Sequence, residues 1–329
     1  DVPAWRAEQT VRRSDPAAAQ IGVGISTWVD ATAGFQTSQR TLLSCAPDGR
    51  VRVWPGTASS GQGHASAFAS LVAARLGVSV DEVEIREPDT AQLAEVIGSF
   101  GSRSAQVAGS SLAAGCDRLV DAARHRAAAL LEAAPEDIEH RADGSFGVVG
   151  VPSRSLAWAD IAPLEAEGGF DQPDRTYPAG CHVAVVEVDP ETGGSRLLAL
   201  ATATDCGTVL HEAIAAGQVA GGSVQGAAHA LWEEVVFDVD ANPLTSTLAD
   251  YGMPSAAELC DVGVRFVPSP TPRNPLGAKG VAESGTVGAP AAVQNAVVDA
   301  LAHLGVRHID QPCTPLRVWQ AVQLTQRGE

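Results

Sequence analysis

The chain has 329 residues, so one large domain or two ordinary ones are expected. Its 45% hydrophobic and 19% charged residues are typical of a globular protein and exclude a disordered chain. The formal net charge of −17, from 22 Lys and Arg against 39 Asp and Glu, argues against binding to nucleic-acid phosphates and gives no reason to expect binding to anionic membranes.

Cysteine usage and hydropathy bear on the cellular compartment. The six cysteines are scattered singly without a Cys-x-x-Cys pair, which argues against a zinc ribbon or a protein-bound iron–sulfur cluster and favours a reducing cytosol. The first residues contain no apolar signal-peptide core, and no run approaches the roughly 20 apolar residues that cross a bilayer. We therefore expect a cytoplasmic protein without membrane insertion.

The first half of the sequence alternates strand and helix patterns. Residues 21–29 and 49–54 are rich in β-branched side chains and predict strands. Residues 65–77 predict an amphipathic helix that ends at its final glycine, and residues 80–87 predict a return to strand. Residues 104–134 predict an Ala-rich helix with one or two breaks.

The second half begins after a turn-rich stretch. Residues 155–164 predict a short helix with Ser155 as its N-cap, and residues 165–180 are the best candidate for a domain boundary. Residues 181–205 carry a Gly-Gly turn between two apolar runs and predict a β-hairpin. A Gly-rich helix is expected over residues 213–234, and a last helix over residues 315–326.

Two glycine-containing loops precede predicted helices. "GQGHAS" (61–66) fits a backbone anion seat at a helix N-terminus, although Ser66 replaces the third glycine of a dinucleotide fingerprint. "GSFGSRS" (98–104) adds Ser102 and Ser104 as donors and Arg103 as a charge. The alternatives are a loop that merely turns and a serine cap beside a solvated arginine.

The predicted Gly-rich helix contains glycines that each cost about 1 kcal/mol relative to alanine. A helix tolerates that cost when another body lies against its backbone. Gln218 and Gln225 are two turns apart and share a face, so they could hydrogen-bond a planar polar ligand. Close packing against another helix or a sheet explains the glycines equally well.

Glu283 lies among small residues in "NPLGAKGVAESGTVGAP", and its nearest basic neighbour is Lys279. A carboxylate shielded by small residues can be desolvated, which raises its pKa and suits a general base. The alternative is an ordinary exposed loop glutamate. None of the eight histidines forms an HxH, HExxH or HxxxH pair, and GxSxG and Walker A motifs are absent.

Taken in order, these stretches resemble one family. "GQGHASAFASLVAARLGV", "GSFGSRSAQVAGSSL", "GQVAGGSVQGAAHALWEE", "YGMP" and "NPLGAKGVAESGTVGAPAAVQNAVVDAL" are similar to the C-terminal half of the molybdenum-binding large subunit of the xanthine dehydrogenase/aldehyde oxidase/carbon monoxide dehydrogenase family. The resemblance covers residues 21–322 and implies an α+β fold with mixed sheets and packed helices. It implies two molybdopterin-binding lobes, residues 1–165 and residues 166–329, the second carrying the catalytic glutamate.

The resemblance also implies a cofactor and the residues that bind it. The cofactor would be molybdopterin, in bacteria commonly a cytosine dinucleotide, whose dithiolene holds the molybdenum without protein ligands. The expected binding residues lie along the pterin or pyrophosphate (Gln62, Gly63, His64), at the phosphate and nucleotide (Gly101, Ser102, Arg103, Ser104), beside the pterin (Gln218, Gly221, Gly222, Gln225) and next to the glutamate (Lys279, Gly280).

Glu283 matches the family's catalytic base, which would deprotonate a hydroxyl ligand of the molybdenum so that its oxygen attacks an electron-poor carbon. The implied activity is hydroxylation or oxidation of an N-heterocycle or aldehyde with water as the oxygen source. Two departures stand out: Ala282 replaces the usual glycine before the glutamate, and His211-Glu212 replaces a usual Asn-Pro.

Partners are implied as well, because the sequence matches only half of a family large subunit. The expected partners are the other half of the molybdenum subunit, a subunit with [2Fe–2S] clusters and an FAD subunit. The chain would be either a natural split subunit or a piece of a larger one. The alternatives are a carbon monoxide dehydrogenase-type subunit and, from another class, a non-catalytic protein that holds or delivers molybdopterin.

Overall fold

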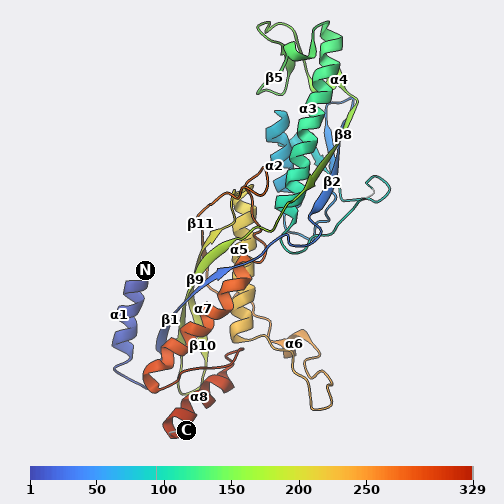
Figure 1. Cartoon of the computed structure of the whole chain (residues 1–329). Helices are drawn as coiled ribbons and strands as arrows, with labels where there is room; N and C mark the ends of the chain where they lie inside the picture. Colours follow the sequence, from blue (N-terminus) through green and yellow to red (C-terminus); the bar gives the residue numbers. More distant parts are fainter. Residues whose placement is uncertain (94, 328–329) are drawn as a thin grey trace.

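A four-stranded sheet forms the body of the lower part of the molecule in Figure 1. The computed structural model describes residues 1–93 and 95–327. The strands are β1 (Gln20–Val29), β9 (Ala179–Val188), β10 (Ser195–Asp205) and β11 (Val262–Phe266), in the order β1-β9-β10-β11. The first three are antiparallel neighbours, and β11 runs parallel to β10.

Two long helices cover this sheet. Helix α7 (Ser284–Leu301) packs on β1 and β9, and α5 (Glu212–Leu231) packs against α7. Gly22 and Gly24 of β1 face the α7 backbone so closely that a Cβ at either position would collide with main-chain atoms of α7. The apolar core between these elements includes valines and alanines of β9 and α7 with low side-chain volume, which permits that close approach.

A second four-stranded sheet lies in the upper part of Figure 1. Its order is β4-β3-β2-β8, from Val83–Ile85, Val51–Trp54, Ser38–Cys45 and Leu164–Asp171. Helices α2 (His64–Leu76) and α3 (Gly109–Leu131) pack with this sheet around a separate core of aliphatic and aromatic side chains. A π-helical turn, η2 (Ser104–Ala108), leads into α3. Two short 3₁₀ turns, η1 (Val80–Glu82) and η3 (Pro135–Asp137), lead into β4 and β5.

A three-stranded sheet completes the upper part: β5 (Ile138–His140), β6 (Phe146–Val148) and β7 (Ser155–Leu156). The expectation that Ser155 caps a helix is wrong, because Ser155 is extended in β7 and pairs with Gly147. The helix that follows, α4 (Trp158–Ile161), has Ala157 at its N-cap. The Asp160 carboxylate accepts a hydrogen bond from the Ala157 N–H at 2.8 Å.

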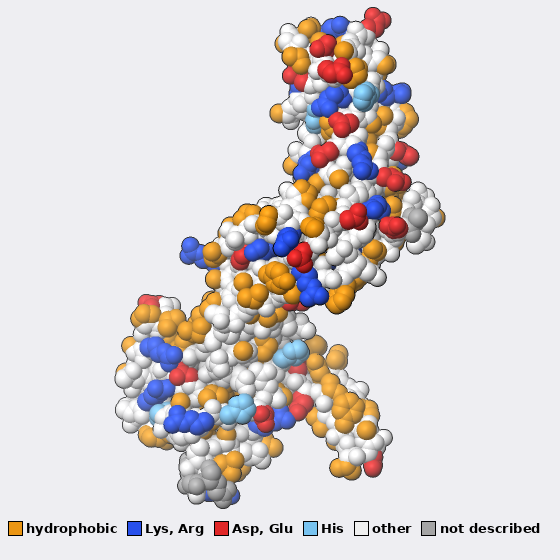
Figure 2. Space-filling model, viewed as in Figure 1, with side chains coloured by type: hydrophobic (Ala, Val, Ile, Leu, Met, Phe, Trp, Pro, Cys, Tyr) orange, Lys and Arg blue, Asp and Glu red, His pale blue; other side chains and the backbone are white. Residues whose placement is uncertain are grey.

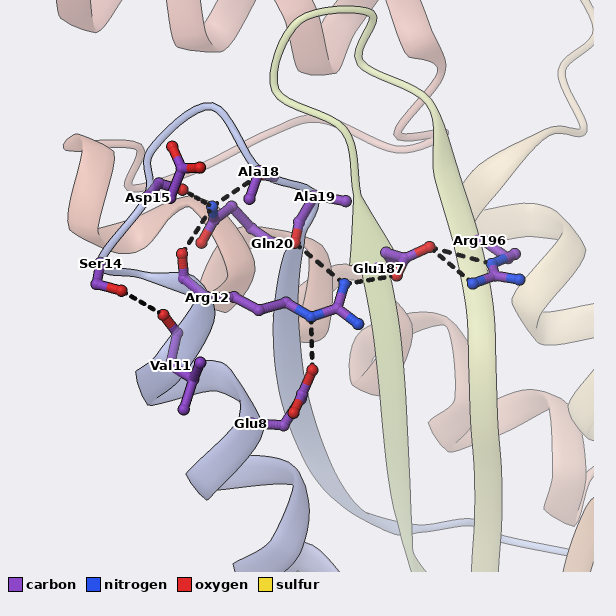
Figure 3. A network of polar contacts seen from close by, with 10 residues as sticks. All are labelled: Glu8, Val11, Arg12, Ser14, Asp15, Ala18, Ala19, Gln20, Glu187 and Arg196. Atoms are coloured by element: carbon purple, nitrogen blue, oxygen red, sulfur yellow. Dashed lines mark hydrogen bonds and ion pairs between the residues drawn. The ribbon is translucent and has the colours of Figure 1, made fainter.

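The N-terminal helix α1 (Val2–Arg12) is fixed to the lower sheet by ion pairs (Figure 3). Arg12 donates to Glu8 within the helix at 2.8 Å and to Glu187 of β9 at 2.6 Å. Arg196 of β10 donates to the other oxygen of Glu187 at 2.8 Å. A 3₁₀ turn, η4 (Ala302–Leu304), follows α7, and α8 (Pro315–Arg327) ends the described chain.

Most of the predicted elements are confirmed. The predicted strand over 21–29 is β1, the helix over 65–77 is α2 with Gly77 at its C-cap (φ +66°), and the hairpin over 181–205 is β9–β10. The Gly-rich helix is α5. The α+β fold with mixed sheets and packed helices is also confirmed.

The expected boundary after residue 165 lies inside β8, and β1, from the first half, pairs with β9 from the second. Whether the two halves fold independently stays a prediction. Within residues 1–93 and 95–327, every helix is too short or too polar to cross a membrane.

Residues 233–261 form an arm that leaves the body after α5 and contains the short helix α6 (Leu248–Tyr251) (Figure 1). A bridge between Phe237 and Pro243 closes its tip into a hairpin-like loop. Apolar side chains cover the arm in Figure 2. The exposed ones are Val235, Val236, Phe237, Val239, Leu244, Leu248 and Met253.

Candidate functional site

A cavity of about 310 Å³ lies where the two parts of the molecule meet. Four chain segments line it, so residues far apart in the sequence face one another there. The lining residues come from the loop and first turn of α2 (Ser60, Gln62, His64, Ala67, Phe68), from the turn before α3 (Ser99, Phe100, Ser102, Arg103, Ser104, Ala105), from the segment into α5 (Cys206, Thr208, Val209, Leu210, His211, Ile214, Ala215, Gln218) and from the loop before α7 (Ala278, Lys279, Val281, Ala282, Glu283).

Glu283 is half-buried in the cavity wall, at the N-cap position of α7. Burial raises the pKa of its carboxyl group above the ordinary value, and the nearby charge of Asp30 raises the pKa further. The Ser102 hydroxyl donates a hydrogen bond to Glu283 Oε2. The alternative of an ordinary exposed loop glutamate is therefore wrong.

The loop before α2 places an imidazole in the cavity. His64 is the first residue of α2, is buried, and its Nδ1 has no hydrogen-bond partner among the described residues. Burial lowers the pKa of His64, so the neutral ring is favoured at neutral pH. Gly63 has φ +81° and packs against Ile214 of α5, and Gln62 donates to Ser99 Oγ at 3.0 Å.

Arg103 is not solvated, and its guanidinium already donates to other parts of the protein. Its side chain is fully buried and donates to Gln36 O at 3.1 Å, to Gln39 Oε1 at 2.8 Å and to Ser38 O at 2.9 Å. These bonds fasten the turn before α3 to the start of β2. Binding of a phosphate by Arg103 stays a prediction, and the contacts favour a scaffolding role.

The other serine of this turn is also engaged. Ser104 is buried, and its hydroxyl lies 3.0 Å from Thr57 Oγ1 and 2.9 Å from Ser99 Oγ. Gly101 has φ +52°, and no described heavy atom lies within 4 Å of a Cβ built on it. The turn therefore presents open backbone beside a fixed hydroxyl cluster.

The glycines of α5 divide into two groups. A Cβ on Gly222 would lie 3.2 Å from Gly285 Cα, and a Cβ on Gly226 would lie 2.8 Å from Ala289 Cβ, so both serve packing on α7. At Gly217 and Gly221 no described heavy atom lies within 4 Å of the added Cβ. Both explanations of the Gly-rich helix therefore apply, to different glycines.

Only one of the two α5 glutamines lines the cavity. Gln218 does, whereas the exposed Gln225 accepts from Thr286 Oγ1 at 3.4 Å outside it. Lys279 lines the cavity, but its ammonium group is paired with Asp205 at 2.6 Å. Gly280 is buried, and its N–H donates to Thr32 Oγ1 at 3.2 Å.

The cavity thus brings together eight of the fourteen predicted residues, and the other six lie beside it or nearby in the same segments: Gly63, Gly101, Gly221, Gly222, Gln225 and Gly280. Sequence reasoning missed the apolar wall formed by Phe68, Phe100, Leu210 and Ile214. The unusual His211-Glu212 pair was a sequence signal for one segment of this wall, because it lies between Leu210 and Ile214. His211 lines the cavity and caps α5, accepting from the Ile214 N–H at 3.4 Å.

The donors in and beside the cavity fit a polar organic ligand. Within the described part of the chain, no group of three or more His, Cys, Asp or Glu side chains is placed to hold a metal ion. The cavity offers an unpartnered buried nitrogen on His64 and the amide of Gln218, and open backbone lies beside it at Gly101 and Gly221. With Glu283 in the wall, such a site can bind a polar ligand and move a proton.

Comparisons with known proteins agree with this reading. The family model described as "Molybdopterin cofactor-binding domain" matches residues 1–260. The carbon monoxide dehydrogenase large chain of Hydrogenophaga pseudoflava is 36% identical over 98% of this chain and 43% of its own length. The 6-hydroxypseudooxynicotine dehydrogenase complex subunit gamma of Paenarthrobacter nicotinovorans is 34% identical over 99% of this chain and 42% of its own length.

Solved structures give the same result. A Cu,Mo-CO dehydrogenase superposes with a TM-score of 0.90 at 30% identity, over 99% of this chain and 44% of the other. The quinoline 2-oxidoreductase of Pseudomonas putida 86 superposes with a TM-score of 0.89 at 33% identity, over 98% of this chain and 44% of the other. The chain therefore spans less than half the length of these relatives.

Proposed function

The chain belongs to the molybdopterin cofactor-binding domain family, and from this premise we propose that it is the cofactor-binding part of a molybdenum hydroxylase or dehydrogenase in which Glu283 is the general base. The observation that carries the proposal is the Glu283 carboxylate, which is half-buried in the cavity wall with a raised pKa. A base with a pKa closer to neutrality accepts a proton more effectively while it remains largely ionised.

The proposed cofactor is molybdopterin, in the cytosine dinucleotide form, and when bound it supplies the redox chemistry of a molybdenum centre. His64 Nδ1, the Gln62 and Gln218 amides and the open backbone at Gly101 and Gly221 would hold its polar groups. Lys279 would contribute only a compensated charge because Asp205 already neutralises it. The apolar wall formed by Phe68, Phe100, Leu210 and Ile214 would keep water away from the reacting groups.

Glu283 would take a proton from a water-derived nucleophile as that nucleophile attacks an electron-poor carbon of an N-heterocycle or an aldehyde. The position of its carboxylate at the start of α7 favours the ionised form, because the positive end of the helix dipole lies there. Burial acts in the opposite direction and keeps the carboxylate basic. A protein that only holds or delivers the cofactor would have no use for this balance.

The proposal includes partner subunits: the other half of the molybdenum subunit, a [2Fe–2S] subunit and an FAD subunit, which would carry electrons away. The arm of residues 233–261 supports it, because exposed valine, leucine, phenylalanine and methionine side chains gather on a segment that leaves the body (Figure 2). No disulfide joins the six cysteines, which agrees with a cytoplasmic location.

The proposal is tested on the enzyme purified with its partner subunits. We expect molybdenum and pterin in equal amounts, release of cytidine monophosphate by pyrophosphatase digestion, and turnover of N-heterocycles or aldehydes with an artificial electron acceptor. Turnover of carbon monoxide alone would assign the chain to the carbon monoxide dehydrogenase type. A stable, monomeric chain that carries neither molybdenum nor pterin, even when produced with its neighbouring subunits, would overturn the proposal.

A further inference from the structure

Ser102 and Glu283 are 181 positions apart in the sequence, and a hydrogen bond joins them. Ser102 Oγ also accepts from the Ala282 N–H at 3.1 Å. An ionised carboxylate can only accept and a backbone N–H can only donate, so the direction of both bonds is fixed. The Ser102 hydroxyl proton must point at Glu283 Oε2 whenever Glu283 is ready to act as a base.

The backbone at Ser102 is in a conformation that side chains rarely adopt. Its φ is +51°, in the left-handed region, which costs a residue with a Cβ roughly 1–2 kcal/mol relative to ordinary conformations. Such strain persists only where the surroundings impose it, and it concentrates at functional sites. An observed outlier that points a hydroxyl at the proposed base therefore indicates a role for that hydroxyl.

A buried hydrogen-bond cluster holds Ser102 in this conformation. The Gln106 amide nitrogen donates to the Ser102 carbonyl at 2.9 Å and to Thr32 Oγ1 at 3.0 Å. Thr176 Oγ1 donates to Gln106 Oε1 at 2.7 Å, and the side chains of Gln106, Thr32 and Thr176 are all buried. Because each partner is itself fixed, the turn that carries Ser102 has little freedom to move.

The same cluster reaches the loop that carries Glu283. Thr32 Oγ1 accepts from the Gly280 N–H at 3.2 Å, and a Cβ on Gly280 would collide with the side chains of Ser102 and Thr32. One threonine thus receives donors from both sides of the contact, the turn before α3 and the loop before α7. The absence of a side chain at Gly280 lets the two segments approach until Ser102 reaches Glu283.

We infer that Ser102 is a positioning residue, which fixes the Glu283 carboxylate in the cavity wall and stabilises its ionised form through the hydroxyl hydrogen bond. The inference rests on the proposed function of Glu283 as the base. Without the hydroxyl, the ionised carboxylate loses a charge-assisted hydrogen bond and protonation becomes easier. The acid limb of the pH profile would then move to higher pH, and the carboxylate would rotate more freely.

Other charges face Glu283 and remain in place when Ser102 is changed. Asp30 raises the pKa of Glu283, and Lys279, already paired with Asp205, lies in the same loop. His64 and His211 line the same cavity from α2 and from the start of α5, and the buried guanidinium of Arg103 lies next to Ser102 in the chain. A shift common to two Ser102 variants therefore reports the hydroxyl and not these groups.

The test compares Ser102→Ala with Ser102→Gly. Both variants remove the hydroxyl, but alanine keeps the strained backbone whereas glycine accepts φ +51° freely. On the acid limb of the pH profile, we expect kcat/KM of both cofactor-loaded variants to be about tenfold below that of the wild type. At high pH, where Glu283 is ionised in all three proteins, we expect a smaller loss. Ser102→Gly should unfold at a higher temperature than Ser102→Ala, because glycine relieves the strained backbone, and both variants should keep their molybdenum and pterin.

A readout that needs no cofactor is the titration of Glu283 itself. In the full chain labelled with ¹³C at glutamate side-chain carboxyls, the Glu283 signal is the one that Glu283→Gln removes. We expect its titration midpoint to move to higher pH in both Ser102 variants. Unchanged midpoints and pH profiles in both variants, with Glu283→Gln inactive, would overturn the role of Ser102 alone. An active Glu283→Gln would instead overturn the proposed function on which the inference rests.

Discussion

Gly222 of α5 and Gly285 of α7 lie in direct contact: a Cβ on Gly222 would lie 3.2 Å from Gly285 Cα, and a Cβ on Gly285 would lie 2.7 Å from the Gly222 carbonyl carbon. Gly285 is two residues after Glu283, so this contact sets how the first turn of α7 lies on α5. Gln218 is one turn before Gly222 on α5 and lines the same cavity as Glu283. The contact therefore fixes the position of Glu283 relative to Gln218.

Gly285→Ala should destabilise the fold and displace Glu283. The added methyl group would collide with the Val219 carbonyl and the Ser223 N–H of α5, which belong to rigid helical backbone. Overpacking of this kind typically costs about 1–3 kcal/mol. We expect a lower free energy of unfolding in urea and a lower kcat in the loaded enzyme. The idea fails if Gly285→Ala matches the wild type in both measurements.

Gly221→Ala should separate cofactor binding from stability. No described heavy atom lies within 4 Å of a Cβ at this position, and alanine favours a helix over glycine by about 1 kcal/mol. We therefore expect a higher melting temperature together with a lower molybdenum and pterin content, because the methyl group would occupy space that the cofactor needs. Gly217→Ala is the comparison variant, since it gains the same helix propensity one turn earlier on the same face of α5. Full cofactor content in Gly221→Ala would show that this glycine does not face the cofactor.

His182 should make the stability depend on pH. Its ring is fully buried, Nδ1 accepts from Trp28 Nε1 at 3.1 Å, and Nε2 lies 3.3 Å from Ser223 Oγ. Burial lowers the pKa of His182 to about 4. Between about pH 6.5 and pH 4 the unfolded chain binds a proton at this site that the folded chain does not, so stability is lost as the pH falls through that window.

The size of this effect follows from the two pKa values. At the acid end of the window, the free energy of unfolding should be lower by about 3 kcal/mol because of His182. We expect the free energy of unfolding in urea to change less between pH 7 and pH 5 in His182→Gln than in the wild type. Glutamine keeps an acceptor for Trp28. Equal differences in the two proteins would mean that His182 is not the group responsible.

Local sequence signals predicted the elements that depend on local physics. Gly77 ends α2 because the left-handed C-cap favours glycine, and the β9–β10 hairpin follows from its Gly-Gly turn. The pairing of β1 with β9 has no such signal, because it joins residues about 160 positions apart in the chain. Ser155 failed as a cap because strand pairing with Gly147 competes with helix capping.

The candidate site divides in the same way. Its glycine-containing stretches could be found in the sequence because glycine in a helix or before one is costly without a reason. The function of each glycine could not be found, since Gly221 and Gly222 are adjacent in sequence and only the second touches α7. Arg103 lies in a Gly- and Ser-rich stretch that is typical of anion-binding sites, yet its guanidinium donates to three acceptors at and before the start of β2. The contact of Ser102 with Glu283 depends on how the two parts of the chain meet.

The most direct test of the central claim is turnover of the Glu283→Gln enzyme purified with its partner subunits. Its matched control is Glu191→Gln, an exposed glutamate in the turn between β9 and β10, remote from the cavity lining. We predict that both variants keep wild-type molybdenum and pterin contents, that kcat of Glu283→Gln falls by at least about 10²–10⁴-fold, and that Glu191→Gln retains activity. A fully loaded Glu283→Gln enzyme with kcat within a few-fold of the wild type would contradict the assignment of Glu283 as the base.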